Sequence, residues 1–176
     1  MAATGQGRAS ARVNVAGRGE TNVGTGLPVL DHLLTLLAEY ASFDLTLDVE
    51  PGSSEVEIVA AARSLGEALA ESLRPPAAQG YGSAIAPVDE ALAHVVLEAS
   101  GRPLLVSNVD LSQARIAGLA GDLAARFLDE FSQAAGLTLH VRLVEGSDTQ
   151  HVLEAIFKAL GIALAQACRP RRKEQE

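Results

Sequence analysis

Residues 43–47 read Phe-Asp-Leu-Thr-Leu, and residues 137–141, which lie 94 positions later, read Leu-Thr-Leu-His-Val. A second stretch, Leu-Gly-Glu-Ala-Leu-Ala at 65–70, returns after 95 positions as Leu-Gly-Ile-Ala-Leu-Ala at 160–165. The first stretch of each half alternates as a strand does, and the second has the spacing of a helix. Because a duplicated unit places equivalent residues at equivalent sites, the repeat predicts two similar halves, at residues 10–76 and 80–168.

Further segments around these stretches have apolar residues at strand or helix spacing. We expect strands at 11–15, 43–49, 91–97, 103–108 and 137–143, and helices at about 30–38, 55–73, 116–131 and 147–167. Pro75-Pro76 ends the second helix, because proline cannot continue the hydrogen-bond ladder. For each half we expect the order strand-strand-helix-strand-helix, of which the patterns locate one of the two leading strands in the first half. This order predicts an internally duplicated α+β fold with helices packed against mixed sheets.

The composition is that of a single globular domain over residues 1–176, with 48% hydrophobic and 20% charged side chains. A formal charge of −8 repels a phosphate backbone, and four Phe, two Tyr and no Trp offer little for base stacking. The lone cysteine, Cys168, excludes an internal disulfide, and no stretch approaches the roughly 20 apolar residues of a membrane span. We therefore expect a cytoplasmic protein without nucleic-acid or membrane partners, ending in a flexible polar tail at 169–176.

Four histidines are the first candidates for chemistry. His151 and Glu154 are three positions apart on the last predicted helix and therefore share a face, a spacing that lets an imidazole and a carboxylate hold one divalent cation. Such a pair is also common on solvated helix faces. His32 alone is typical of a helix terminus, His140 of a packed or interfacial strand position, and His94 of a structural role.

Five blocks of the sequence resemble the imidazoleglycerol-phosphate dehydratase family, in the family's order. They are TGLPVLDHLL at 25–34, APVDEALA at 86–93, SGRP at 100–103, LTLHVRL at 137–143 and HVLEAIFKALGIAL at 151–164. The resemblance implies a hydro-lyase of histidine biosynthesis, which converts imidazole glycerol phosphate to imidazole acetol phosphate. It also implies two manganese ions, a small phosphorylated imidazole as substrate, and a homo-oligomer in which adjacent subunits share metal ligands.

The resemblance assigns roles to five residues of this chain. His32, His140, His151 and Glu154 occupy metal-ligand positions. Glu154 is in addition the implied catalytic residue, and Arg102 is the implied phosphate-binding arginine. The metals would stabilise the negative charge that develops on the imidazole ring as water leaves.

Other family positions are changed here. Val56 and Val59 stand where the family has a histidine and a glutamate, Gln150 replaces the first histidine of the second pair, and Gly80 replaces an arginine. We also expect the family's Pro-Ser-Thr-Lys-Gly phosphate loop to be missing. These changes predict an incomplete or absent manganese site, with at most one weak metal ion per chain.

Two compensating interpretations stay open at this point. Glu55 and Glu57 offer a rearranged carboxylate site, and the basic residues of the tail offer a substitute for the phosphate loop, although a solvated chain end explains the tail as well. Two functions remain in competition. One is a weakly active dehydratase, and the other is a non-catalytic relative that acts as a binding protein or an assembly partner, mixed with a complete dehydratase. In either case we expect an oligomer larger than a dimer.

Overall fold

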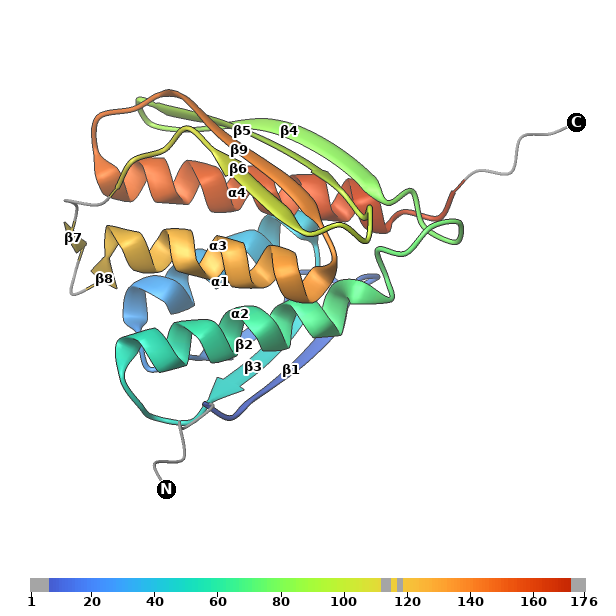
Figure 1. The fold of residues 1–176 in the computed structure, drawn as a ribbon, viewed down its shortest axis with the longest axis horizontal. Helices are drawn as coiled ribbons and strands as arrows, with labels where there is room; N and C mark the ends of the chain where they lie inside the picture. Colours follow the sequence, from blue (N-terminus) through green and yellow to red (C-terminus); the bar gives the residue numbers. More distant parts are fainter. Residues whose placement is uncertain (1–6, 112–114, 117–118, 172–176) are drawn as a thin grey trace, which may run out of the picture.

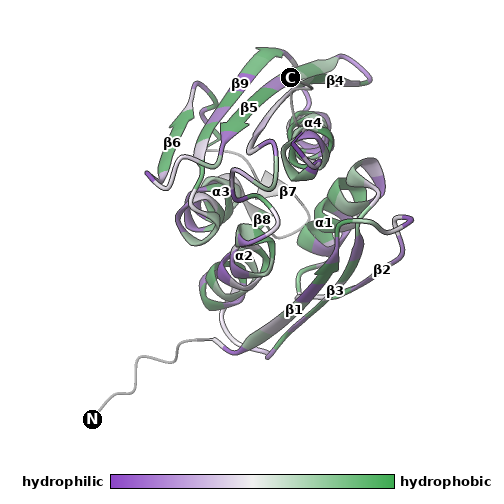
Figure 2. Ribbon diagram, turned by 90° about the vertical axis from the view of Figure 1, so that its right-hand side faces the viewer, coloured by the Kyte–Doolittle hydropathy of each residue, from purple (hydrophilic) through white to green (hydrophobic). Residues whose placement is uncertain are grey.

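Two β-sheets form the outer layers of the molecule, and four helices lie between them in two further layers (Figures 1 and 2). The computed structural model describes residues 7–111, 115–116 and 119–171. The first half contains β1 (Ala9–Asn14), β2 (Thr21–Gly24), α1 (Pro28–Ala41), β3 (Asp44–Val49) and α2 (Ser54–Ala70). The second half contains β4 (Tyr81–Val88), β5 (Ala91–Glu98), β6 (Leu104–Ser107), β7 (Arg115–Ile116), β8 (Leu119–Ala120), α3 (Gly121–Ala135), β9 (Thr138–Glu145) and α4 (Thr149–Cys168). The predicted α+β class is confirmed.

The strand order shows the duplication directly. The first sheet has the order β1-β3-β2, with β1 antiparallel and β2 parallel to β3. The second has the order β4-β5-β9-β6, with β5 antiparallel and β6 parallel to β9. Leu45 of β3 pairs with Val13 and Thr21, and Leu139 of β9 pairs with Leu97 and Leu105. From Val13 to Leu97 and from Thr21 to Leu105 the displacement is 84 positions in both cases. The two sheets therefore have the same arrangement of strands.

The helices follow the same plan. Ser53 and Asp148, which are 95 positions apart, cap the N-termini of α2 and α4. Ser42 and Gly136, 94 positions apart, both have left-handed backbones (φ 57° and 72°) where α1 and α3 end. Because each end has its counterpart, α1 corresponds to α3 and α2 to α4, and residues can be matched across the halves one by one.

Two close helix crossings join the halves, α1 with α4 and α2 with α3, and each crossing depends on a glycine. A Cβ on Gly161 of α4 would lie 2.3 Å from the carbonyl oxygen of Leu37 on α1. A Cβ on Gly66 of α2 would lie 2.7 Å from the Cβ of Ala134 and 3.0 Å from the carbonyl oxygen of Phe131 on α3. The two glycines are 95 positions apart, and Leu37 and Phe131 are 94 apart. The two helix pairs therefore make the same crossing.

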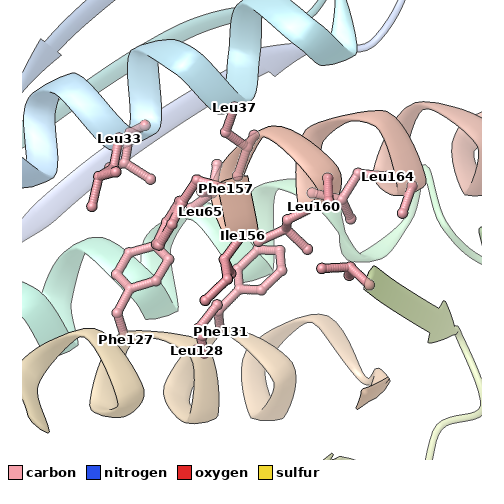
Figure 3. Close-up of a cluster of buried hydrophobic side chains, with 14 of the residues drawn as sticks. Leu33, Leu37, Leu65, Phe127, Leu128, Phe131, Ile156, Phe157, Leu160 and Leu164 are labelled. Atoms are coloured by element: carbon pink, nitrogen blue, oxygen red, sulfur yellow. The ribbon is translucent and has the colours of Figure 1, made fainter. Parts of the chain in front are cut away.

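A shared apolar core joins the four helices (Figure 3). Phe157 of α4 lies against Phe127 of α3, with ring centroids 5.6 Å apart. Leu37, Leu65 and Phe131 are also fully buried and come from the other helices of the cluster. Burial of such side chains contributes about 1.5–3 kcal/mol each, which ties the two halves into one folding unit.

One predicted element needs correction. The helix predicted from residue 116 begins only at Gly121, and Ile116 and Leu119 lie in the short strands β7 and β8 instead. The strands predicted at 91–97 and 103–108 are present as β5 and β6, and β9 lies between them in the sheet. Strand β4 begins at Tyr81, the second residue of the predicted second half.

Two strands, β2 and β4, were not recognised in the sequence. β4 lies at a sheet edge and contains Gly82 and Pro87, both untypical of strands. A Cβ on Gly82 would meet the carbonyl oxygen of Ala163 on α4, so the glycine is needed for close approach of strand and helix. Most of the predicted flexible tail, residues 172–176, lies outside the described residues.

Helix α4 is the one described helix that is long and apolar enough, by length and composition, to cross a membrane. In this fold 61% of its apolar window is buried, against α1 and the strands β4 and β5. Its apolar character is therefore explained by its place at the centre of the molecule.

Candidate functional site

The first turns of α1 and α4 bring two of the predicted ligands together. Nε2 of His32 lies 3.0 Å from Oε1 of Glu154, although the two residues are 122 positions apart. The amide nitrogen of Gln150 donates to the same oxygen at 3.2 Å. The His32 side chain is 57% exposed, whereas that of Glu154 is 15% exposed. We call these three residues the α1/α4 site. It borders a cavity of 190 Å³ with apolar walls that include Val29 and Leu153.

Local hydrogen bonds hold both helix starts. At α1, the backbone nitrogen and hydroxyl of the buried Thr25 both donate to Oδ1 of Asp31, so the loop before the helix is tied to the residue that precedes His32. At α4, Oδ1 of the N-cap residue Asp148 accepts from the backbone nitrogens of Gln150 and His151 at 2.9 and 3.2 Å. These hydrogen bonds hold the helix starts that carry His32 and Glu154, which therefore face each other from rigid elements.

His151 lies next to this site but has other partners. Its Nδ1 is 2.7 Å from Oε2 of Glu90, and its Nε2 is 3.3 Å from Oδ2 of Asp89. Both carboxylates belong to the two-residue turn between β4 and β5, where Asp89 has a φ of 49°. With a carboxylate at each ring nitrogen, the charged imidazolium form is favoured.

The electrostatics of this turn follow from its hydrogen bonds. The backbone nitrogen of Asp148, which donates to Glu90 at 2.8 Å, and then the His151 ring lower the pKa of Glu90 to about 2. The Glu90 carboxylate is in turn the main reason that the pKa of His151 is raised above 6.5. The turn and the start of α4 are thus joined by an ion pair that persists over a wide range of pH.

The remaining predicted site residues lie elsewhere. His140 is exposed on β9 between the buried Leu139 and Val141, as its alternation predicts, and lines a separate cavity of 360 Å³ with His94. Arg102 lies past the end of β5, whereas Glu90 and its partner His151 lie at the start of that strand. One chain therefore places the predicted phosphate-binding residue and the predicted ligand helix at opposite ends of a strand.

The matched helix pair, α3 with α2, carries different chemistry. Applying the same displacements, Arg126 of α3 corresponds to His32, Glu55 to Gln150, and the valines 56 and 59 to His151 and Glu154. The guanidinium Nε of Arg126 lies 3.2 Å from Oε1 of Glu130, whose Oε2 lies 2.9 Å from Nε of Arg63. A nitrogen of Arg126 also lies 3.7 Å from Glu55. We call Glu55, Arg63, Arg126 and Glu130 the α2/α3 cluster.

The sequence analysis missed Arg126, although the signal was present. The displacement of 94 positions, once applied to His32, leads to it.

The proposed carboxylate pair, Glu55 and Glu57, separates in the structure. Glu55 is exposed beside Arg126, whereas Glu57 is buried and accepts from the backbone nitrogen of Gly52 at 3.0 Å. Residues two apart on a helix face different directions, which explains the separation.

The donor atoms at the two helix pairs decide which pair suits a metal ion. His32 and Glu154 offer an imidazole nitrogen and a carboxylate oxygen at one point, which fits a divalent cation with two protein ligands. Among the described residues no group of three His, Cys, Asp or Glu side chains is close enough to hold a metal. Water or a second chain would have to complete the coordination. The α2/α3 cluster, with its two arginines, does not fit a cation.

Comparisons with known proteins converge on one family. The family model described as imidazoleglycerol-phosphate dehydratase matches residues 25–164. Proteins of that name from Pelobacter propionicus and Syntrophobacter fumaroxidans are 39% and 41% identical over 171 residues, covering 94% of this chain and 87% and 86% of theirs. The solved dehydratase structure from Staphylococcus aureus has a TM-score of 0.84 at 29% identity, covering 92% of this chain and 94% of its own. That from Pyrococcus furiosus, in complex with (S)-C348, has 0.85 at 28%, covering 98% and 95%.

Proposed function

Because the chain belongs to the imidazoleglycerol-phosphate dehydratase family, we propose that it dehydrates imidazole glycerol phosphate to imidazole acetol phosphate, more slowly than a relative with a complete ligand set. This is a step of histidine biosynthesis, which we place in the cytoplasm. The observation that carries the proposal is the 3.0 Å contact between His32 and Glu154, because it assembles two metal-binding side chains from opposite ends of the sequence.

The α1/α4 site has the groups that such a reaction needs. Manganese, when bound, supplies a Lewis acid that stabilises negative charge on the substrate imidazole. His32 and Glu154 would hold it. Both hydrogen bonds that the Glu154 carboxylate accepts from described residues end on Oε1. The carboxylate is therefore oriented, and Oε2 is the oxygen we assign to a ligand or a proton. The low exposure of Glu154 strengthens either interaction.

We further propose that a complete site needs more than one chain. His140 and Arg102 are both distant from the α1/α4 site along the fold, so the residues that would complete coordination and bind the phosphate come from a neighbouring subunit. This agrees with the expected homo-oligomer larger than a dimer. Light scattering of the purified chain checks it, and a monomer at micromolar concentration would refute it.

A second candidate function is a non-catalytic partner of a complete dehydratase. The specific observation in its favour is the α2/α3 cluster, where Val56, Val59 and Arg126 stand at the positions that match His151, Glu154 and His32. This chain therefore lacks the donor atoms for one of the two metal ions that the family resemblance implies, while it keeps the helix crossings.

One assay separates the two candidates. Product formation from imidazole glycerol phosphate is measured with manganese for the unmodified chain, for Glu154→Ala, and for the matched control Val59→Ala on the other helix pair. The dehydratase predicts manganese-dependent turnover that Glu154→Ala abolishes and Val59→Ala retains. A folded, metal-loaded chain without turnover would support the non-catalytic candidate instead.

A further inference from the structure

The two matched helix pairs pose a question that the proposed function leaves open, namely what the α2/α3 cluster has become. In the internal repeat, the cluster occupies the position that corresponds to the α1/α4 site, and its side chains form ion pairs with one another. Glu130, with a side chain only 14% exposed, lies between the guanidinium groups of Arg63 and Arg126. Both of its carboxylate oxygens are engaged.

We infer that the α2/α3 cluster is the second copy of the α1/α4 site, converted from a cation site into an ion-pair clasp between α2 and α3. The inference rests on the proposed function in one respect, that the α1/α4 site is the copy that binds metal. It adds that Arg126 is the residue that closes the other copy to cations. The chain then has one metal-binding helix pair and one structural helix pair.

The chemistry of the substitution supports the conversion. An arginine is always charged, has five donors and no acceptor, and therefore repels a divalent cation from the point where His32 offers a nitrogen in the other helix pair. Val56 and Val59 have no donor atoms. The least exposed carboxylate of the cluster, Glu130, already accepts from two guanidinium groups. Each change alone weakens a metal site, and together they remove it.

The geometry supports a common origin. The Gly66 crossing keeps α2 and α3 in the same contact as the Gly161 crossing keeps α4 and α1. Beside the cluster lies a cavity of 610 Å³, with walls that include Val56, Val59 and Arg126. There is accordingly space at these three positions for larger or differently shaped side chains. The backbone frame of a site remains, and only the donor atoms are changed.

Reversing the three substitutions tests the inference. The full-length variant Val56→His, Val59→Glu, Arg126→His copies His32, Glu154 and the neighbouring His151 onto the α2/α3 frame. Manganese binding is counted by calorimetric titration and by electron paramagnetic resonance of the metal. We expect the variant to bind about one ion per chain more than the unmodified protein, because the frame already holds the donors together. The matched control, with alanine at the same three positions, should gain none.

Two results would overturn the inference: a folded triple variant that gains no ion, or an alanine control that gains as much. If the triple variant does not fold, the double variant Val59→Glu, Arg126→His decides by the same count, because it copies the His32–Glu154 pair alone. Failure of the proposed function is distinguishable. It would appear as an unmodified chain that binds no manganese, whereas the inference concerns only the gain above that baseline.

Discussion

The α1/α4 and α2/α3 helix pairs have the same frame and different chemistry. Each is crossed at a glycine, capped at matched residues and packed into one shared core. At one surface end of the first pair a histidine meets a glutamate, and at the matched end of the second an arginine holds a glutamate. Packing positions require only shape, which many apolar side chains supply. Ligand positions require particular atoms, so they can be lost without disturbing the fold.

The largest expected effect concerns the two glycine crossings. Gly161→Ala should lower the free energy of unfolding by about 3 kcal/mol, because its Cβ would press on backbone of α1 that cannot rotate away. Gly66→Ala should cost only about 1 kcal/mol, since its nearest contact is the methyl group of Ala134 and alanine favours the helix. Urea unfolding measures both, with Gly24→Ala, whose nearest neighbour is 3.5 Å away, as control. Equal losses in the free energy of unfolding at the two crossings would contradict this difference between a backbone contact and a methyl contact.

The next effect concerns the matched pair His32 and Arg126. His32→Ala should weaken manganese binding by about 10- to 100-fold, because it removes one of two protein donors at the α1/α4 site. Arg126→Ala should leave the affinity unchanged, since the residue lies in the helix pair without donors. Isothermal titration of both variants gives the comparison. A comparable loss in Arg126→Ala would mean that the two helix pairs are not independent in metal binding.

The smallest effect concerns the pH dependence of the link between His151 and Glu90, which has no counterpart at Val56. The pKa of Glu90 is lowered to about 2, so its contribution is complete above 4.5 and is lost as the pH falls towards 2. The pKa of His151 is raised, so its contribution is complete below 6.5 and is lost as the pH rises through the raised value. The link is therefore complete between about pH 4.5 and 6.5.

Nuclear magnetic resonance titration of the His151 ring checks this link. Glu90→Gln should lower the pKa of His151, because the carboxylate that holds the proton becomes a neutral amide. Glu55→Gln, in the first turn of α2, should leave it unchanged. A His151 pKa that does not respond to Glu90→Gln would contradict the ion pair.

Much of the frame could be predicted from the sequence, because a repeat is a statement about three-dimensional equivalence. The displacement of 94 and 95 positions matched β3 with β9 and α2 with α4 correctly. The sequence pattern did not reveal β4, because small residues and Pro87 are untypical of a strand. It also placed the start of α3 too early. There Ile116 and Leu119 have helical spacing, but the helix begins at Gly121, whose missing Cβ lets it approach Leu111.

The candidate site was predictable only in part. Helix geometry correctly predicts that His151 and Glu154 lie on one face of α4. In the structure, however, His151 contacts Asp89 and Glu90, whereas Glu154 contacts His32. These choices depend on how a two-residue turn and two helix starts meet in space, which no local pattern contains. Whether His32, His140, His151, Glu154 and Arg102 act as the family resemblance implies stays a prediction.

The central claim is that two equivalent frames differ in their ability to hold a cation. Anomalous diffraction at the manganese edge, from crystals of the unmodified chain grown with manganese, tests it most directly. The account predicts one anomalous peak per chain beside His32 and Glu154, and none beside Val59 and Arg126. A peak at the α2/α3 cluster, alone or together with the first, would contradict it.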